Sequence, residues 1–268
     1  MSTNGRDRNP LAGKTILVTG ASSGIGEATA RELARRGASV ALVARNAGKL
    51  DTLAGEISSG GGVAFPVPAD VSDRSSVEAA IEAVVGRFGG LYGVVNNAGM
   101  GLSGRVAELR VEDLRHVYEV NVIGAVNLIQ VAVPRLEAGG RIVNVSSVVG
   151  LRSLPMVGGY CSSKSALNAL SDALRVEVAH RGLHVTSVYP GTTTTAFREN
   201  SRRTGSEKRG WRPKGVPPEK VARVIRRALE ADRPPRDAYV SFKDHAFVVG
   251  TALFPGLTDL ALRSWAKG

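Results

Sequence analysis

The chain has 268 residues, of which 43% are hydrophobic and 22% charged, so it can build one large core and is neither disordered nor fibrous. Its single cysteine, Cys161, excludes an internal disulfide and is typical of a reducing compartment. The net charge of +11 would suit a polyanion, but the arginines are spread along helical segments without a nucleic-acid motif, so we expect no nucleic-acid partner.

Neither a membrane span nor a secretory signal stands out in the sequence. We find no apolar run that approaches the roughly 18 to 20 residues needed to cross a bilayer. The chain begins with a polar stretch that lacks the apolar region of a signal peptide. We therefore expect a cytoplasmic protein in which residues 1–12 form a flexible tail.

Apolar strands alternate with helical patterns along most of the chain. The expected strands are 15–18, 39–43, 63–69, 91–95, 141–145, 184–189 and 238–242. The expected helices are 24–36, 46–58, 74–88, 112–136, 158–180 and 218–231. Strands that are apolar throughout are buried on both faces. The pattern therefore predicts a doubly wound α/β fold, in which helices cover both faces of a parallel sheet and ligands bind beyond the carboxyl ends of the strands.

No linker divides the chain, and we assign one catalytic domain to residues 13–243. Within it, the polar segment 192–215 is expected to cover the site as a substrate lid. Phe197 and Trp211 lie there among basic residues. This composition suits recognition of an anionic substrate or, the interpretation we favour, a solvated mobile loop.

The last segment, 244–268, is an apolar C-terminal extension. Pro255 and Asp259 interrupt it, so it cannot be a single spanning helix. It could contact a neighbouring subunit, line the substrate pocket or lie on a membrane surface. We expect it to pack within the protein.

A glycine-rich turn separates the first strand from the first helix. Residues 19–26 read Thr-Gly-Ala-Ser-Ser-Gly-Ile-Gly. Glycines in this setting let the backbone approach a pyrophosphate, whose charge is favoured at a helix N-terminus. We assign cofactor binding to Gly20, Ser22, Ser23, Gly24, Ile25 and Gly26.

The end of the second strand indicates which dinucleotide binds. An acidic residue there would bind the 2′-hydroxyl of NAD, but the sequence has Arg45. A guanidinium suits a 2′-phosphate, which it can hold with paired hydrogen bonds. Although Arg45 could also be a solvated loop residue, we predict NADP(H) rather than NAD(H).

Small and polar residues follow the next two strands. Asn97, Ala98 and Gly99 come after the fourth strand and leave room for the cofactor. Asp70 and Val71 come after the third, where Asp70 could accept a hydrogen bond from the adenine amino group. Either group alone could be turn chemistry, but their recurrence at successive strand ends favours a cofactor site.

The most specific pattern is Tyr160-Cys-Ser-Ser-Lys164 at the start of a helix, with Ser147 at the end of the preceding strand. Residues four apart share a helix face, so the Lys164 ammonium can lie close to the Tyr160 phenol. A free phenol has a pKa of about 10. A nearby cation lowers the pKa toward the range in which the phenol can act as a general acid and base.

With these motifs, the sequence closely resembles the short-chain dehydrogenase/reductase family over about residues 14–231. The resemblance implies a Rossmann-type fold with a seven-stranded parallel sheet, and a homodimer or homotetramer. It also implies a catalytic tetrad of Asn121, Ser147, Tyr160 and Lys164, the last two contacting the cofactor as well. Pro190, Gly191 and Thr195 match the family segment beside the nicotinamide, and Thr193 stands where valine or isoleucine is more common. Asn121 would anchor a water molecule that links Lys164 to solvent.

These features predict an oxidoreductase that transfers a hydride between NADP(H) and the carbonyl or secondary alcohol carbon of a small or lipid-like substrate. Ser147 and Tyr160 would bind the substrate oxygen, and Tyr160 would exchange a proton with it. No metal is expected. The alternatives are an NADP(H)-binding sensor or scaffold without catalysis, and a lyase or epimerase, which would need a larger C-terminal domain.

Overall fold

The computed structural model describes residues 9–199, 201–204 and 215–266. Much of the predicted flexible tail, residues 1–8, lies outside this part, as do residues 205–214 of the predicted lid, which include Trp211. Leu11 is fully buried and the Asn9 side chain bonds to the carbonyl of Arg36, so the tail cannot extend to residue 12 as expected.

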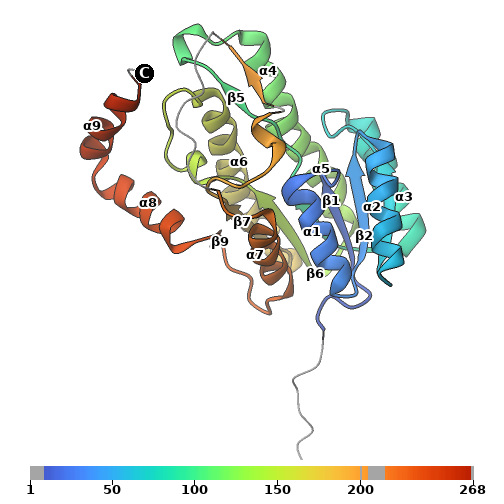
Figure 1. The fold of residues 1–268 in the computed structure, drawn as a ribbon. Helices are drawn as coiled ribbons and strands as arrows, with labels where there is room; N and C mark the ends of the chain where they lie inside the picture. The colour runs from blue at the N-terminus through green and yellow to red at the C-terminus, as the bar shows by residue number, and fades with distance from the viewer. Residues whose placement is uncertain (1–8, 200, 205–214, 267–268) are drawn as a thin grey trace, which may run out of the picture.

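Seven parallel strands form the central sheet, in the order β3-β2-β1-β4-β6-β7-β9 (Figure 1). Their bounds are β1 Thr15–Thr19, β2 Ser39–Ala44, β3 Val63–Pro68, β4 Leu91–Asn96, β6 Leu136–Val145, β7 His184–Tyr189 and β9 Asp237–Tyr239. The predicted doubly wound sheet is thus confirmed. Strand β3 contains prolines and lies at the edge of the sheet. Proline has no amide N–H to donate, and an edge strand tolerates this because its outer side pairs with no neighbouring strand. The order reverses between β1 and β4, which is where such folds bind ligands.

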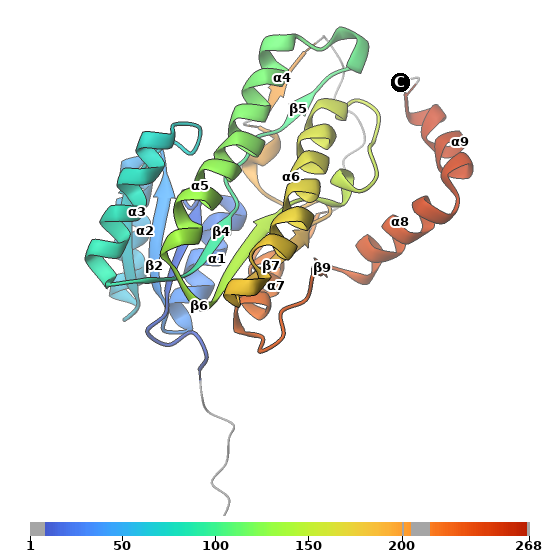
Figure 2. The same ribbon diagram turned by 180° about the vertical axis from the view of Figure 1, so that it is seen from behind.

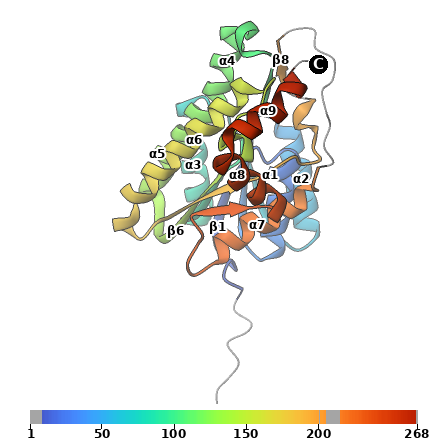
Figure 3. The same ribbon diagram turned by 90° about the vertical axis from the view of Figure 1, so that its left-hand side faces the viewer.

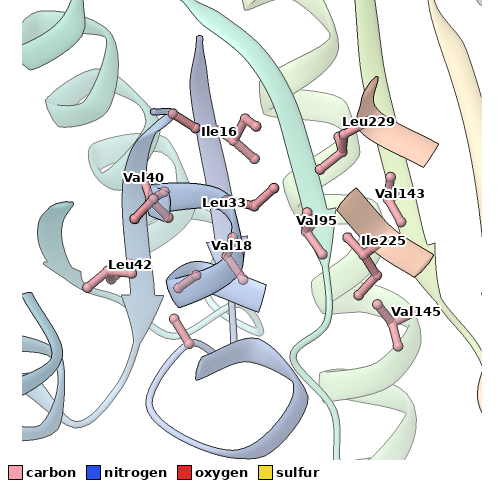
Figure 4. Close-up of a cluster of buried hydrophobic side chains, with 14 of the residues drawn as sticks. Ile16, Val18, Leu33, Val40, Leu42, Val95, Val143, Val145, Ile225 and Leu229 are labelled. Carbon is pink, nitrogen blue, oxygen red and sulfur yellow. The ribbon is translucent and has the colours of Figure 1, made fainter. Parts of the chain in front are cut away.

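Helices cover both faces of the sheet, as expected. One face carries α1 (Gly24–Arg35), α2 (Ala47–Ser59) and α7 (Pro218–Glu230). The other carries α3 (Arg74–Phe88), α5 (Gly124–Ala132) and α6 (Gly158–Glu177), as Figure 2 shows from behind. Successive strand residues point to opposite faces, so Ile16 and Val18 join the first core and Leu17 the second. Figure 4 shows the first core, where Leu33 of α1 and Ile225 of α7 meet the strands.

The single helix expected over 112–136 is interrupted. It consists of α4 (Val111–Tyr118), a π turn η2 (Glu119–Ile123), α5 and a final 3-10 turn η3 (Val133–Arg135). By length and hydropathy the whole run Val111–Arg135 is apolar enough to cross a membrane, contrary to our expectation that no segment would be. Half of its apolar window (50%) is buried inside the fold, however, as in a core helix.

The last predicted strand, 238–242, is wrong at its end. Strand β9 stops at Tyr239, and α8 (Phe242–Leu253) is capped at its start by Ser241, whose hydroxyl accepts the amide N–H of Asp244. A second helix, α9 (Pro255–Ala266), follows at a bend of 107°. Figure 3 shows both helices along the outer side of the molecule, next to edge strand β9. Most of the described large apolar residues of this extension are exposed, so it packs on the protein only in part, through residues such as the buried Thr251.

Candidate active site

The predicted site residues gather at the carboxyl ends of β1, β4, β6 and β7. Thr19 links the first two of these strands. Its hydroxyl accepts the amide N–H groups of Asn97 and Ala98, each at 3.0 Å, and donates to the carbonyl of Val95. The Asn97 side chain donates back to the Thr19 carbonyl at 2.9 Å. The asparagine motif therefore supports the glycine turn through the protein's own hydrogen bonds.

The glycine turn is shaped for an anion. Gly20 and Gly24 have φ angles of +65° and +58°, which side chains other than glycine rarely adopt. A Cβ on Gly26 would lie 2.2 Å from the Gly20 carbonyl oxygen, so no larger residue fits there. Within the described chain, Ser23 makes no side-chain capping bond to α1. The amide N–H groups of the first helical turn can therefore serve a phosphate.

Arg45 and Asp70 lie side by side at the ends of β2 and β3. Arg45 Nη1 is 4.0 Å from Asp70 Oδ2, and the arginine side chain is 73% exposed. Burial opposes ionisation of Asp70, yet hydrogen bonds from Ser72 and the charges of Arg45 and His116 bring its pKa below the usual value. Ser72 occupies Oδ1 with two hydrogen bonds, which leaves Oδ2 for the predicted contact with adenine.

Val71 has a packing role that the sequence did not indicate. A Cβ on Gly124 would lie 2.7 Å from Val71 Cγ2, so the start of α5 packs tightly on this residue. Its carbonyl accepts a hydrogen bond from Asn127. The side chain of Val71 is buried, which leaves its backbone as the part nearest a cofactor.

Asn121 lies in the π turn η2, a geometry that is rare and concentrated at functional sites. Its amide nitrogen donates to the Met100 carbonyl and to the Ser163 hydroxyl, each at 2.9 Å, and its oxygen accepts the Met100 amide at 2.8 Å. Both donors are thus used and one acceptor position remains. The side chain joins the loop after β4 to α6 and has little capacity left for the predicted water.

Ser147 and Tyr160 meet at the end of β6. Their hydroxyls lie close enough for Ser147 to influence the Tyr160 phenol, and Ser147 donates to the Pro190 carbonyl at 3.2 Å. The Tyr160 ring lies 5.6 Å from the ring of Phe197, centroid to centroid. Burial, and to a smaller degree the nearby Cys161, raise the pKa of Tyr160 well above its ordinary value.

Lys164 lies one helical turn after Tyr160, as expected, but its ammonium is 6.0 Å from the centre of the phenol ring. It donates to the Val145 carbonyl at 2.8 Å. Burial lowers the pKa of Lys164 to about 8. The expected lowering of the tyrosine pKa is therefore not observed, because desolvation of the phenol dominates while the ammonium bonds to a backbone carbonyl.

The segment 190–195 lies between the glycine turn and the C-terminal helices. A Cβ on Gly24 would lie 3.1 Å from Thr195 Cγ2, so Thr195 packs directly on the turn. Gly191 lies against Asp244, since a Cβ there would come within 2.2 Å of its carboxylate. Thr193 forms an isolated parallel bridge with Val216. The segment thus places the Pro190 carbonyl beside Ser147 and Thr195 beside the glycine turn.

The described part of the lid, unlike a solvated loop, is attached to the body. Strand β8 (Arg202–Arg203) pairs with β5 (Leu102–Ser103). Arg202 also forms a 2.7 Å ion pair with Asp113, whose pKa this contact lowers. Sequence reasoning missed Asp113, because an acidic residue in the first turn of a helix is common for its favourable interaction with the helix dipole.

Comparisons with known proteins agree with this geometry. The sequence profile of the short chain dehydrogenase family matches residues 14–206. An uncharacterized oxidoreductase of Bacillus subtilis, YxnA, is 34% identical over 255 residues, which are 93% of this chain and 71% of the relative.

Two solved structures are similar over most of their length. A short-chain dehydrogenase/reductase from Burkholderia phymatum in complex with NAD superposes with a TM-score of 0.82 at 26% identity, covering 93% of this chain and 96% of that one. An alcohol dehydrogenase from Thermococcus sibiricus complexed with 5-hydroxy-NADP gives 0.76 at 33% identity, covering 84% and 95%. From the motifs, the sheet order and these matches we conclude that the chain belongs to the short-chain dehydrogenase/reductase family of oxidoreductases.

Proposed function

We propose that the protein is an NADP(H)-dependent oxidoreductase that interconverts a ketone and a secondary alcohol on a small or lipid-like molecule. The observation that carries this proposal is the proximity of the Ser147 and Tyr160 hydroxyls, with Lys164 one turn further along α6. Two hydroxyls at one point can bind a single carbonyl oxygen. A buried ammonium within 6.0 Å of the phenol ring stabilises negative charge there.

In the reductive direction, the hydroxyls of Ser147 and Tyr160 hold and polarise the carbonyl oxygen. Tyr160 gives its proton to that oxygen as negative charge develops on it. The cofactor supplies the hydride. The pKa of Tyr160 is not lowered, so the phenol carries its proton at neutral pH and can act as the donor. Lys164 stabilises the phenolate that is left and binds the nicotinamide ribose.

Three sets of residues fit the cofactor. The turn from Gly20 to Gly26 offers backbone N–H groups to the pyrophosphate. Gly99 lies beside two members of the tetrad, since a Cβ there would be 3.2 Å from Asn121 Oδ1 and 3.6 Å from the Lys164 ammonium. Arg45 favours a 2′-phosphate, and its exposed, distant pairing with Asp70 is weak enough to yield to one. One structural neighbour is a complex with NAD and another with 5-hydroxy-NADP, so the overall fold accepts both kinds of dinucleotide. We therefore base the preference for NADP(H) in this protein on Arg45.

The assembly and location of the protein remain predictions. We propose a homodimer or homotetramer on the basis of family membership. We propose a cytoplasmic location on the basis of composition.

The test of this function is turnover in the presence of NADPH and a panel of ketones that range from small to long-chain. We expect loss of NADPH absorbance with at least one ketone, at a rate proportional to enzyme concentration. Calorimetry measures NADPH binding in parallel. Tight binding without turnover of any ketone, or of the matching alcohols with NADP, would instead assign a sensor or scaffold.

A further inference from the structure

The C-terminal helix pair, α8 and α9, presents an unusual number of apolar side chains to solvent. Among the described residues, the large ones are Phe242, Val249, Leu253, Phe254, Leu257 and Leu260. Phe242 is 82% exposed, and Leu253 and Leu257 are 67% and 66% exposed. Exposed apolar residues gathered in this way on a soluble protein point to an interaction site.

The exposed residues of α8 form one stripe. Phe242, Ala246, Val249 and Leu253 are spaced by four, three and four residues, which places them on one helix face. Thr251 and Asp244 are on the other side: Thr251 is buried, and Asp244 lies against Gly191. A surface helix of a soluble protein normally points its apolar residues inward, whereas α8 carries half-buried Phe247 and Val248 and, in addition, this apolar stripe on its outer face.

The charges of the pair favour an anionic partner. Both of its acidic residues already have contacts: Asp244 lies against Gly191 of the body and accepts a 2.8 Å bond from its own N-cap residue Ser241, and Asp259 forms an ion pair with Arg152. Lys243, near the start of the pair, and Arg263, near its end, are exposed. The chain as a whole carries a net charge of +11.

The hydropathy of the pair reaches that of a membrane segment, but the two helices meet at an angle of 107°. A straight span of about 20 residues is therefore not formed. A bent amphipathic pair with basic ends instead suits the plane of the interface, with its apolar side chains among the acyl chains and its lysine and arginine at the headgroups.

We propose that α8 and α9 dock the protein on the surface of a membrane that contains anionic lipid. A second copy of the chain fits this surface less well. A two-fold interface places the same patch against itself, so each side would bring the exposed basic residues Lys243 and Arg263, while Asp244 is bonded to Ser241 and Asp259 is paired with Arg152.

The test is sedimentation of the full-length protein with vesicles of phosphatidylglycerol and phosphatidylcholine, compared with phosphatidylcholine alone. We expect the wild type to bind the anionic vesicles. The double variant Leu253→Ser/Leu257→Ser should bind at least about tenfold more weakly, because two leucines no longer enter the lipid. Val176→Ser is the matched control, since Val176 is an equally exposed apolar residue (78%) on α6, and should bind like the wild type.

A second pair of changes isolates the charges. Lys243→Glu/Arg263→Glu should remove the preference for anionic vesicles. Circular dichroism verifies folding, which the exposed positions should leave intact, and no arm depends on enzymatic activity. Wild-type protein that stays in the supernatant, or a leucine variant that binds as strongly as wild type, would overturn the proposal. If analytical ultracentrifugation then showed that only the leucine variant loses a dimer, the surface would be a subunit interface.

Discussion

At the scale of single residues, the buried lysine is the most costly feature of the site. Lys164 is 4% exposed, and burial lowers its pKa from 10.5 to about 8. Below pH 8 the ammonium is protonated in the folded and unfolded states, so the folded state carries the whole desolvation cost, about 3 kcal/mol. From pH 8 to about 10.5 the unfolded chain binds more protons, so the contribution of this residue to stability rises with pH.

We therefore expect Lys164→Met to stabilise the protein at pH 7 by about 1–3 kcal/mol, after allowance for the lost bond to the Val145 carbonyl. The gain should shrink between pH 8 and 10.5. Urea unfolding at pH 7 and pH 10 measures it. Lys14→Met, at a lysine that is 40% exposed, is the control and should change stability by less than about 0.5 kcal/mol. A variant less stable than wild type at pH 7 would contradict this explanation.

Arg45 decides the cofactor in our proposal. Arg45→Asp should weaken NADPH binding about 100-fold, because a charge-assisted contact is lost and a carboxylate is added beside Asp70. NADH has no 2′-phosphate, so its binding should change by less than about threefold. Calorimetry with both nucleotides measures this. Arg35→Asp is the control, since it makes the same change at an exposed position of α1 and should alter the binding of neither nucleotide. Equal losses of NADPH and NADH binding in Arg45→Asp would refute the role of Arg45.

At the scale of elements, one ion pair joins the lid to α4. Asp113 is buried, and its carboxylate bonds to Arg202 at 2.7 Å. Beside it, Arg202 N donates to Gly101 O at 3.0 Å and Thr204 N to Ser103 O at 2.9 Å. Breaking the pair leaves a buried carboxylate with weaker partners, so the short strand β8 should detach more often.

In Arg202→Met we expect the rate of amide hydrogen exchange at positions 202 and 204 to rise by at least about tenfold. This corresponds to a loss of about 1.4 kcal/mol of local stability. Mass spectrometry of the corresponding peptides measures the exchange. Arg110→Met is the comparison, since that more exposed guanidinium lies 3.7 Å from the same carboxylate and should matter less. Unchanged exchange in Arg202→Met would show that strand pairing alone holds the lid.

Elements were predictable where the signal was local. Tyr160 and Lys164 share one helical turn, and the glycine turn is contiguous, so their positions followed from spacing. Arg202 and Asp113 are 89 residues apart and gave no local signal. The start of α8 did have one: Ser241 followed by Asp244 is a helix-capping pattern. The expected strand was nevertheless continued past this signal to residue 242, whereas β9 ends three residues earlier, at Tyr239.

At the scale of the whole molecule, α7 completes the core although it lies beyond the part matched by the family profile, residues 14–206. Ile225 is fully buried against the strands (Figure 4). We expect Ile225→Ala to cost about 2–5 kcal/mol and Ile225→Val about 0.5–1.5 kcal/mol, because the cavity grows with each methyl group removed. Denaturant unfolding measures both. Costs below about 0.5 kcal/mol for the alanine variant would mean that α7 packs loosely.

The sheet was predictable because strands buried on both faces are apolar throughout, as Ile16, Leu17 and Val18 are. The same reasoning failed for the C-terminal extension. There, Leu253 and Leu257 suggested burial in the protein, yet they are exposed. Apolar composition predicts removal from water but does not identify what covers the residue.

The measurement that tests the central claim most directly is the steady-state turnover of Tyr160→Phe together with its affinity for NADPH. Removal of one hydroxyl should lower kcat by at least about a thousandfold, while NADPH binding changes by less than about threefold. Tyr92→Phe removes a comparable hydroxyl, bonded to the Leu229 carbonyl at 3.2 Å, and should keep wild-type turnover. If Tyr160→Phe retained substantial turnover, the phenol would not be the proton donor and the mechanism would be wrong.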